Sequence, residues 1–167
     1  MNYQIRKKEK KDCMEIAHVV TLSWNESYKG IVPDDFLNHL YQTEEERGRN
    51  AYDQFDEKNN HQYVLEIDHK IVGFINVGEA QEEEQSNCGE IYAIYILNEY
   101  KGYGYGRKLF EMGIKELKQM GFDKMIIGCL VENPTNHFYT HLGGKKIKTR
   151  IFPLLQLPEN VYYYEKI

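Results

Sequence analysis

Apolar residues in the first part of the chain follow a weak strand pattern and then a helical one. Residues 2–6 alternate between polar and apolar, which favours a short first strand. From about Asp12 the apolar residues are spaced for one face of a helix, and Gly30 is expected to end it. That face consists of Cys13, Ala17, Val20, Trp24 and Tyr28. A strand followed by an amphipathic helix is therefore expected.

Two further helices are predicted before residue 60. Pro33 is placed to open a short helix with the sequence DDFLNHLY. Thr43 and Glu46 have the spacing of a capping box, which predicts a polar helix through about Lys58. This helical third carries no glycine loop and no catalytic spacing of its own.

Beyond residue 60 the pattern is mainly that of strands. His61–Ile67 and Lys70–Glu79 flank the polar pair Asp68-His69, which predicts a hairpin. An amphipathic helix is expected after Gly106, with Leu109, Phe110, Ile114 and Leu117 on one stripe. Other strands are predicted at 91–97, 124–131, 145–152 and 161–167, and the loop at 153–160 has no pattern that places it. The fold class predicted is α/β (α+β), with one mixed, mostly antiparallel sheet and helices on both faces.

Length and composition narrow the class of protein. A chain of 167 residues suits a single domain over 1–167 with a sizeable core. The net charge of −5 argues against a general nucleic-acid binder, and no apolar run approaches the length of a membrane span. Three well-separated cysteines favour reduced thiols in a cytoplasmic protein rather than a disulfide framework or a metal site. We expect a globular protein that binds no metal.

Residues 90–110, EIYAIYILNEYKGYGYGRKLF, carry the strongest chemical signal. An apolar run resembling a buried strand leads into Gly102, Gly104 and Gly106, and a helix is predicted directly after them. Glycines let the backbone approach a phosphate, and the unpaired amides of a helix start favour an anion. Lys101 and Arg107 add positive charge. The segment is expected to bind a pyrophosphate.

The spacing of the glycines decides which pyrophosphate is expected. The chain contains no P-loop string, and the dinucleotide pattern Gly-x-Gly-x-x-Gly fails because Arg107 occupies its last position. Lys101–Gly106 instead resembles the acetyl-CoA motif Gln/Arg-x-x-Gly-x-Gly/Ala of the GNAT superfamily of N-acetyltransferases. Lys101 departs from the usual Gln or Arg, although it keeps a cation. A glycine-rich turn before a surface helix remains the alternative.

A second motif of the same family follows about thirty residues later. The stretch CLVENPTNHFYTHLGG resembles the family's strand, Asn, short helix and Leu-Gly close. The matching positions are Asn133, Asn136, Phe138, Tyr139, Leu142, Gly143 and Gly144. Two motifs in the family's order and separation support the resemblance, which extends from about residue 61 to the C-terminus and more loosely over the N-terminal third.

The resemblance implies a cofactor, acetyl-CoA (coenzyme A), held in a cleft where two strands separate. It also implies that Trp24 and Tyr28 lie in a helix that forms one wall of the acceptor site, although both residues could equally be core. The positions implied to contact the cofactor are Ile94, Tyr95, Ile96, Lys101, Gly102, Tyr103, Gly104, Tyr105, Gly106, Arg107, Asn133, Asn136 and Tyr139. Asn133 could instead be a plain helix cap.

Acetyl transfer from a thioester to an amine requires a base for the amine and an acid for the leaving thiolate. Glu90 and Tyr92 share a strand face with Ile94, and the resemblance implies that this face lines the cleft and holds the base. Glu90 is the favoured base, although it could be a solvated acid at a strand end. Tyr139 matches the family tyrosine that protonates the thiolate, with a packed aromatic as the alternative.

The sequence therefore predicts an acetyl-CoA-dependent N-acetyltransferase acting on a primary amine, either a small molecule or a protein amino group. Two alternatives stay open: a non-catalytic acyl-CoA-binding regulatory module, and an enzyme of nucleotide phosphates. Residues 79–86 contain four acids, which is typical of a solvated loop or of an acidic rim that attracts a polyamine. The sequence leaves the acceptor and the choice between monomer and homodimer undecided.

Overall fold

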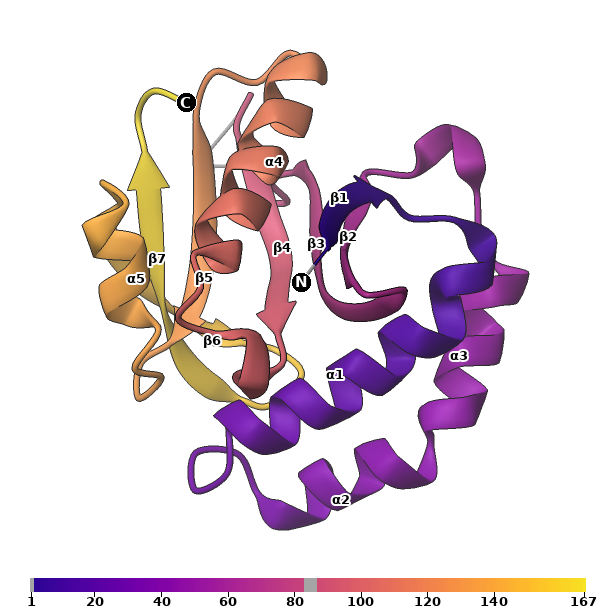
Figure 1. Cartoon of the computed structure of the whole chain (residues 1–167). Helices are drawn as coiled ribbons and strands as arrows, with labels where there is room; N and C mark the ends of the chain where they lie inside the picture. Colours follow the sequence, from indigo (N-terminus) through magenta and orange to yellow (C-terminus); the bar gives the residue numbers. More distant parts are fainter. Residues whose placement is uncertain (1, 83–86) are drawn as a thin grey trace. The chain divides into compact units, whose positions relative to one another are not determined.

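A computed structural model describes residues 2–82 and 87–167 of the chain (Figure 1). Within these residues, seven strands form one mixed sheet in the order β1-β2-β3-β4-β5-β7-β6. The strands are β1 (Tyr3–Lys7), β2 (Gln62–Ile67), β3 (Lys70–Glu79), β4 (Gly89–Ile96), β5 (Met125–Leu130), β6 (Lys145–Phe152) and β7 (Leu157–Tyr164). The α-helices are α1 (Cys13–Ser27), α2 (Asp34–Gln42), α3 (Glu44–Asp53), α4 (Tyr105–Gln119) and α5 (Asn136–His141). The mixed sheet with helices that the sequence predicts is confirmed.

The chain divides into two compact units, each built from two segments. Unit 1 is Met1–Asn76 with Ala93–Gly113, and unit 2 is Val77–Tyr92 with Ile114–Ile167. The chain passes from one unit to the other within β3, β4 and α4. Each unit is described by itself below.

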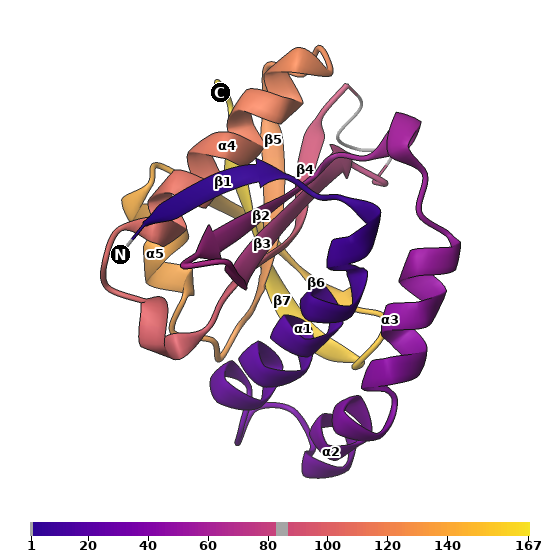
Figure 2. The same ribbon diagram turned by 45° about the vertical axis from the view of Figure 1, so that its right-hand side comes forward.

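Unit 1 is built around the antiparallel pairs β1–β2 and β2–β3 (Figure 2). Asp68 and His69 both have positive φ, 48° and 68°, as a two-residue hairpin turn of type I′ requires. Leu97 donates its backbone N–H to Val72, so the end of β4 lies beside the start of β3. The predicted hairpin is therefore confirmed.

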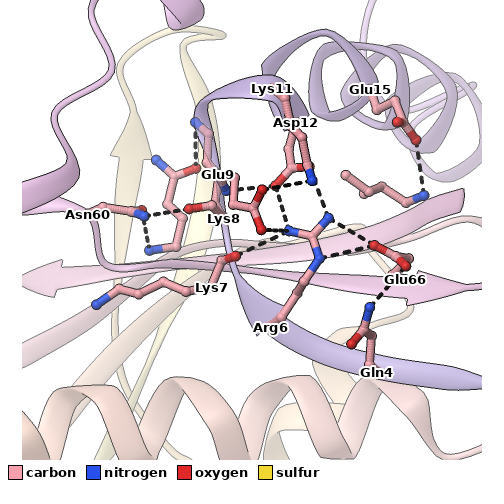
Figure 3. Close-up of polar contacts among 12 residues, drawn as sticks. Gln4, Arg6, Lys7, Lys8, Glu9, Lys11, Asp12, Glu15, Asn60 and Glu66 are labelled. Atoms are coloured by element: carbon pink, nitrogen blue, oxygen red, sulfur yellow. Dashed lines mark hydrogen bonds and ion pairs between the residues drawn. The ribbon is translucent and has the colours of Figure 1, made fainter. Parts of the chain in front are cut away.

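Helices lie on both faces of the sheet in unit 1. The Tyr3 ring lies 5.2 Å from the ring of Tyr105, the first residue of α4. Arg6, on the opposite face of β1, donates hydrogen bonds to Asp12 at the start of α1 and to Glu66 on β2 (Figure 3). One guanidinium thus joins β1, β2 and α1.

Unit 2 is centred on β5. Strand β5 pairs parallel with β4 over Gly89–Ile91 and antiparallel with β7 along its whole length. Strand β6 in turn pairs antiparallel with β7. The buried residues Cys88, Ile126 and Val161 form a core cluster on one face of these strands.

Three boundaries differ from those that the sequence predicts. Thr43 forms no capping box, because its hydroxyl donates to the carbonyl of His39 one turn earlier. Helix α3 ends at Asp53, and a separate 3₁₀ turn at Glu57–Asn59 follows it. Strand β7 begins at Leu157 rather than at residue 161, so the loop after β6 is a turn of four residues, 153–156.

Candidate functional site

The glycine loop, residues 98–106, has the backbone geometry of an anion site. Gly102 and Gly104 lie in the left-handed region, with φ of +85° and +83°, and both face open space. The first intrahelical bond of α4 runs from the Lys108 amide to the Gly104 carbonyl. The amides of the first helical turn have no internal acceptor and lie at the positive end of the helix. Gly106 lies in that turn, where a phosphate can approach the backbone.

The two predicted cations beside this loop have different surroundings. The ammonium of Lys101 donates to Asn98 Oδ1 at 2.6 Å and to Ser27 Oγ at 3.3 Å, so it ties the loop to the end of α1. Asn98 also donates its amide to Glu26 Oε2 at 2.9 Å. Arg107 is exposed on the first turn of α4 and lies 3.9 Å from Glu111. In unit 1, Lys101 therefore orders the loop, while Arg107 faces solvent beside it.

Trp24 and Tyr28 belong to a packed aromatic cluster in unit 1. Their rings are 4.9 Å apart and lie 6.1 and 6.5 Å from the ring of Tyr95 on β4. The hydroxyls of Tyr28 and Tyr95 are 3.4 Å apart. Trp24 and Tyr28 are both at least 90% buried. The structure thus brings the two predicted acceptor-site residues onto Tyr95, one of the predicted cofactor contacts.

The other positions predicted to contact the cofactor in unit 1 flank this cluster. Ile94 is half-buried and Ile96 is buried, although both lie on the same face of β4. Tyr105 is buried against Tyr3, whereas Tyr103 has 60% of its surface exposed. Tyr103 is therefore an aromatic ring of the glycine loop that is open to solvent.

Glu90 lies on β4 in unit 2, and its carboxylate is buried and ion-paired. Its side chain is 10% exposed, and Oε1 accepts a hydrogen bond from Arg150 Nη2 at 2.8 Å. Burial raises the pKa of Glu90 above its ordinary value; the bond and charge of Arg150 oppose this shift, and the charges of Glu82 and Glu159 add to it. A carboxylate with a raised pKa is suited to accept a proton near neutral pH.

Tyr92, the other residue considered as a base, already donates its proton. Its hydroxyl bonds to the Glu79 carbonyl, and its ring covers Gly78, where a Cβ would lie 2.5 Å from the ring. Desolvation, and then the charges of Glu90 and Glu79, raise the pKa of Tyr92. This environment favours the neutral phenol, which is a poor base.

Asn133 and Asn136 make structural contacts in unit 2. Asn133 Oδ1 accepts the Thr135 amide at 2.9 Å, which is the local turn expected of a cap. The Asn136 amide nitrogen donates to the carbonyls of Leu130, Val131 and Asn133. Its Oδ1 accepts from Asn160 Nδ2 at 3.1 Å and from the Tyr162 hydroxyl at 2.6 Å. Every donor and acceptor site of Asn136 is therefore used within the protein.

Tyr139 is buried on α5 in unit 2, with 5% of its surface exposed. Its ring lies 5.5 Å from Phe138 and 5.9 Å from Tyr162. Its backbone carbonyl accepts the Tyr164 hydroxyl at 2.8 Å, which fixes the short helix against β7. Two aromatic neighbours therefore pack against the buried ring of Tyr139.

Arg150 and Glu159 are the charged residues near Glu90 that the sequence did not predict. Their contact depends on the β6–β7 register, in which Arg150 lies opposite Glu159. The sequence nevertheless contained an indication of this contact. Gly128 interrupts an otherwise apolar strand, and a glycine inside a strand often marks a site where another group approaches the backbone closely. A Cβ at Gly128 would lie 2.5 Å from Glu159 Oε2 and 2.9 Å from Arg150 Nη2.

Comparison with known proteins identifies the class. Residues 17–143 match the model of the acetyltransferase (GNAT) family, and the chain belongs to that family. It is 33% identical, over 145 residues, to the uncharacterized N-acetyltransferase YuaI of Bacillus subtilis. The alignment covers 86% of this chain and 80% of YuaI. The predicted family and the predicted N-acetyltransferase class are confirmed.

Solved structures agree with this fold. The chain is similar to the PaiA N-acetyltransferase of Thermoplasma acidophilum, crystallised with coenzyme A, with a TM-score of 0.78, 21% identity and coverage of 98% and 100% of the two chains. It is also similar to YncA of Salmonella typhimurium, a putative acetyltransferase crystallised with acetyl-CoA, with a TM-score of 0.65, 17% identity and coverage of 98% and 94%. At these identities the similarity establishes the GNAT fold. None of the helices in the described part of the chain is long and apolar enough to cross a membrane.

Proposed function

We propose that this protein transfers an acetyl group from acetyl-CoA to a primary amine by direct attack in a ternary complex. Membership of the acetyltransferase family supports the reaction, and two solved proteins of similar fold hold coenzyme A or acetyl-CoA. The main observation that supports the proposal for this chain is the backbone geometry of the glycine loop. Gly102 and Gly104 open the backbone beside the start of α4, which fits a pyrophosphate.

The residues of unit 1 are proposed to hold the cofactor. Backbone amides at the start of α4 would bind the pyrophosphate, and the exposed Arg107 would neutralise part of its charge. Lys101 would act through the loop, because its ammonium already bonds to Asn98 and Ser27. The backbone of Ile94, Tyr95 and Ile96 is proposed to pair with the extended arm of the cofactor. Asn133 and Asn136 are left out of this set, because their amides serve the fold.

Glu90 is proposed as the base. An amine with a pKa near about 10 is mostly protonated at neutral pH and must lose a proton before it attacks the thioester carbonyl. Glu90 would accept that proton as the new C–N bond forms, directly or through a water. Its buried carboxylate and raised pKa support this role, while the neutral, donating Tyr92 does not.

Tyr139 is proposed as the acid. When the C–S bond breaks, the departing thiolate needs a proton, and a phenol remains protonated at neutral pH. Tyr139 has the position of the family tyrosine in the second motif, and packing against Phe138 and Tyr162 restricts its ring. A donor whose ring is already restricted would need little further ordering to protonate the thiolate.

The acceptor is proposed to be a primary amine of a small molecule or of a protein. The structure weakens the specific argument for a polyamine. Glu82 bonds to Lys148 and Arg150 and is not a free acid of a rim, and Glu83 and Glu84 lie outside the described residues. Three unpaired, buried cysteines remain consistent with our expectation of a cytoplasmic protein.

A panel of amines assayed with acetyl-CoA, with the released thiol detected, tests the function. Tyr139→Phe should lower kcat on the best amine by roughly 10²- to 10⁴-fold and leave the Kd for coenzyme A nearly unchanged. Tyr41→Phe, which removes the hydroxyl of an exposed tyrosine, is the control and should retain kcat. Tight coenzyme A binding without turnover of any amine would instead favour a regulatory acyl-CoA-binding module. Near-normal kcat in Tyr139→Phe would remove Tyr139 as the acid.

A further inference from the structure

Five charged side chains of unit 2 meet in one cluster, defined as Glu82, Glu90, Lys148, Arg150 and Glu159. Arg150 is its centre, and each of its three guanidinium nitrogens donates to a different carboxylate. Nη2 bonds to Glu90 at 2.8 Å, Nε bonds to Glu159 at 2.6 Å, and Nη1 bonds to Glu82. Lys148 bonds to Glu82 as well. Three carboxylates thus face two cations, which leaves one negative charge over.

Two carboxylates of the cluster are buried against the sheet. Glu90 and Glu159 are each 7% exposed. Gly128 supplies the space they need on β5, since a Cβ there would meet both Glu159 and Arg150. A larger residue at this point would require the Glu159 carboxylate and the Arg150 guanidinium to shift, so the glycine leaves room for the ion pairs as they stand.

The cluster shares the sheet face that carries Glu90. Glu90 lies beside Ile126 of β5, Gly128 of β5 lies opposite Val161 of β7, and residues in register share a face. The titratable and charged groups on the face of Glu90 among the described residues are Arg150 and Lys148 from β6, Glu159 and Tyr163 from β7, Glu82 from the segment after β3, the neutral Tyr92 from β4, and the buried thiol of Cys88 just before β4.

We propose that Arg150 is a positioning residue for acetyl transfer, whose guanidinium keeps the Glu90 carboxylate ionised and fixes its orientation. Glu82 and Glu159 bond to the same guanidinium and thereby weaken its effect on Glu90. This inference rests on the proposed role of Glu90 as base. A buried carboxylate with two acidic neighbours and no cation would be protonated at neutral pH and could take no proton from the amine. A carboxylate paired with an arginine of its own would be too weak a base. Because three carboxylates share one arginine, the Glu90 carboxylate has a basicity between these two extremes.

The sharing predicts shifts of opposite sign in two variants. Arg150→Gln removes the cation, so the midpoint of Glu90 titration should rise by about one pH unit or more. Glu159→Gln removes a competing acid and a repulsive charge, so the midpoint should fall. Arg150→Lys keeps the charge without the three-way geometry and should restore the midpoint more fully than it restores kcat. A residue that only supported the fold would not give this pattern.

The experiment measures each variant in two ways. The ¹³C shift of the Glu90 carboxyl, assigned by its loss in Glu90→Gln, reports its titration without any turnover. The acidic limb of the kcat/KM profile reports the base in catalysis. We expect both midpoints to rise in Arg150→Gln and to fall in Glu159→Gln. If Arg150→Gln fails to fold, both midpoints are measured instead in Glu159→Gln and in the double variant Arg150→Gln/Glu159→Gln, which keeps the net charge of the cluster. These two variants then test the proposal.

The outcomes separate this inference from the proposed function. A Glu90 midpoint that stays fixed in the folded variants overturns the inference, even where Glu90→Gln is inactive and the base assignment holds. A midpoint that moves while the kcat/KM profile stays fixed rejects Glu90 as the base, and with it the positioning role of Arg150. Parallel movement of both midpoints in the two predicted directions supports both.

Discussion

The side chain of Asn136 shows how one residue of a sequence motif can be required by the fold. It donates to the end of β5 and to Asn133, and it accepts from Asn160 and Tyr162 on β7. Only a short side chain that both donates and accepts can make this set, which excludes Asp and the hydrophobic residues. The motif therefore identified an important position, and the structure supplies a reason that does not involve the cofactor.

Asp12 offers a residue-scale prediction in unit 1 that depends on pH. Burial alone would raise the pKa of Asp12, but hydrogen bonds from Arg6 and from the Glu9 amide, together with the charge of Arg6, outweigh it and hold the pKa below its usual value. A depressed pKa in the folded state adds stability above the unfolded pKa of about 3.9, and this stability is lost as pH falls through the folded pKa. Asp12→Asn should therefore lower the free energy of unfolding by about 2 kcal/mol at pH 7.

Urea denaturation at pH 7 and near pH 3 tests this assignment. The difference between wild type and Asp12→Asn should shrink at the lower pH, because Asp12 in the unfolded wild type, with a pKa of about 3.9, is then protonated and the advantage of the depressed folded pKa is reduced. Asp53→Asn, at an exposed position, is the control and should change stability by less than about 0.5 kcal/mol. An equal loss at both values of pH would show that the charge of Asp12 contributes nothing.

At the scale of elements, the glycine loop has a matched control within the same unit. Gly104 and Gly30 have nearly the same backbone conformation, with φ of +83° and +85°, and a Cβ at either would meet nothing within 4 Å. Alanine at either position should thus cost a similar 1–2 kcal/mol or so of backbone strain. Only Gly104→Ala should weaken coenzyme A binding, by about tenfold or about 1.4 kcal/mol, since its methyl group would point at the proposed phosphate site. Calorimetry on both variants measures this difference, and equal affinities would remove the loop from the proposed site.

The elements that the sequence predicted correctly are those determined by residues close together in the chain. The Asp68-His69 hairpin and the strand, glycine loop and helix of 90–119 rest on residues adjacent in the chain, and both were predicted correctly. The predicted capping box at Thr43 was wrong, because its hydroxyl donates to the carbonyl of His39 in the preceding helix and does not cap the next one. The predicted start of β7 at residue 161 was wrong, since a proline such as Pro158 is unusual inside a strand. Its carbonyl nevertheless accepts the Val131 amide, so the strand begins before it.

At the scale of the whole molecule, the motif residues could be predicted and their charged surroundings could not. Tyr139 was proposed from a short motif and Glu90 from the strand face that the family resemblance implies, and both roles stay predictions. The contact of Glu90 with Arg150 joins residues 60 positions apart, and it depends on the registers of three strand pairs, β4–β5, β5–β7 and β6–β7. A shift of one residue in any one of these registers would put Arg150 and Glu90 on opposite faces of the sheet. Only the assembled sheet could therefore reveal which cation controls the proposed base.

The response of the whole protein to coenzyme A gives the last prediction. A ligand that binds only the folded state stabilises it by about 2.7 kcal/mol at one hundred times its Kd. For a chain of this size, each kcal/mol raises Tm by about 2–4 °C, so coenzyme A should raise Tm by about 5–11 °C. ATP carries an adenine and phosphates but no pantetheine arm for β4, and the chain has no P-loop string to hold its phosphates, so its effect at the same concentration should be about 1 °C or less. An equal rise with ATP would favour an enzyme of nucleotide phosphates. A rise with coenzyme A that persists in full in Gly104→Ala would place the binding of coenzyme A outside the glycine loop.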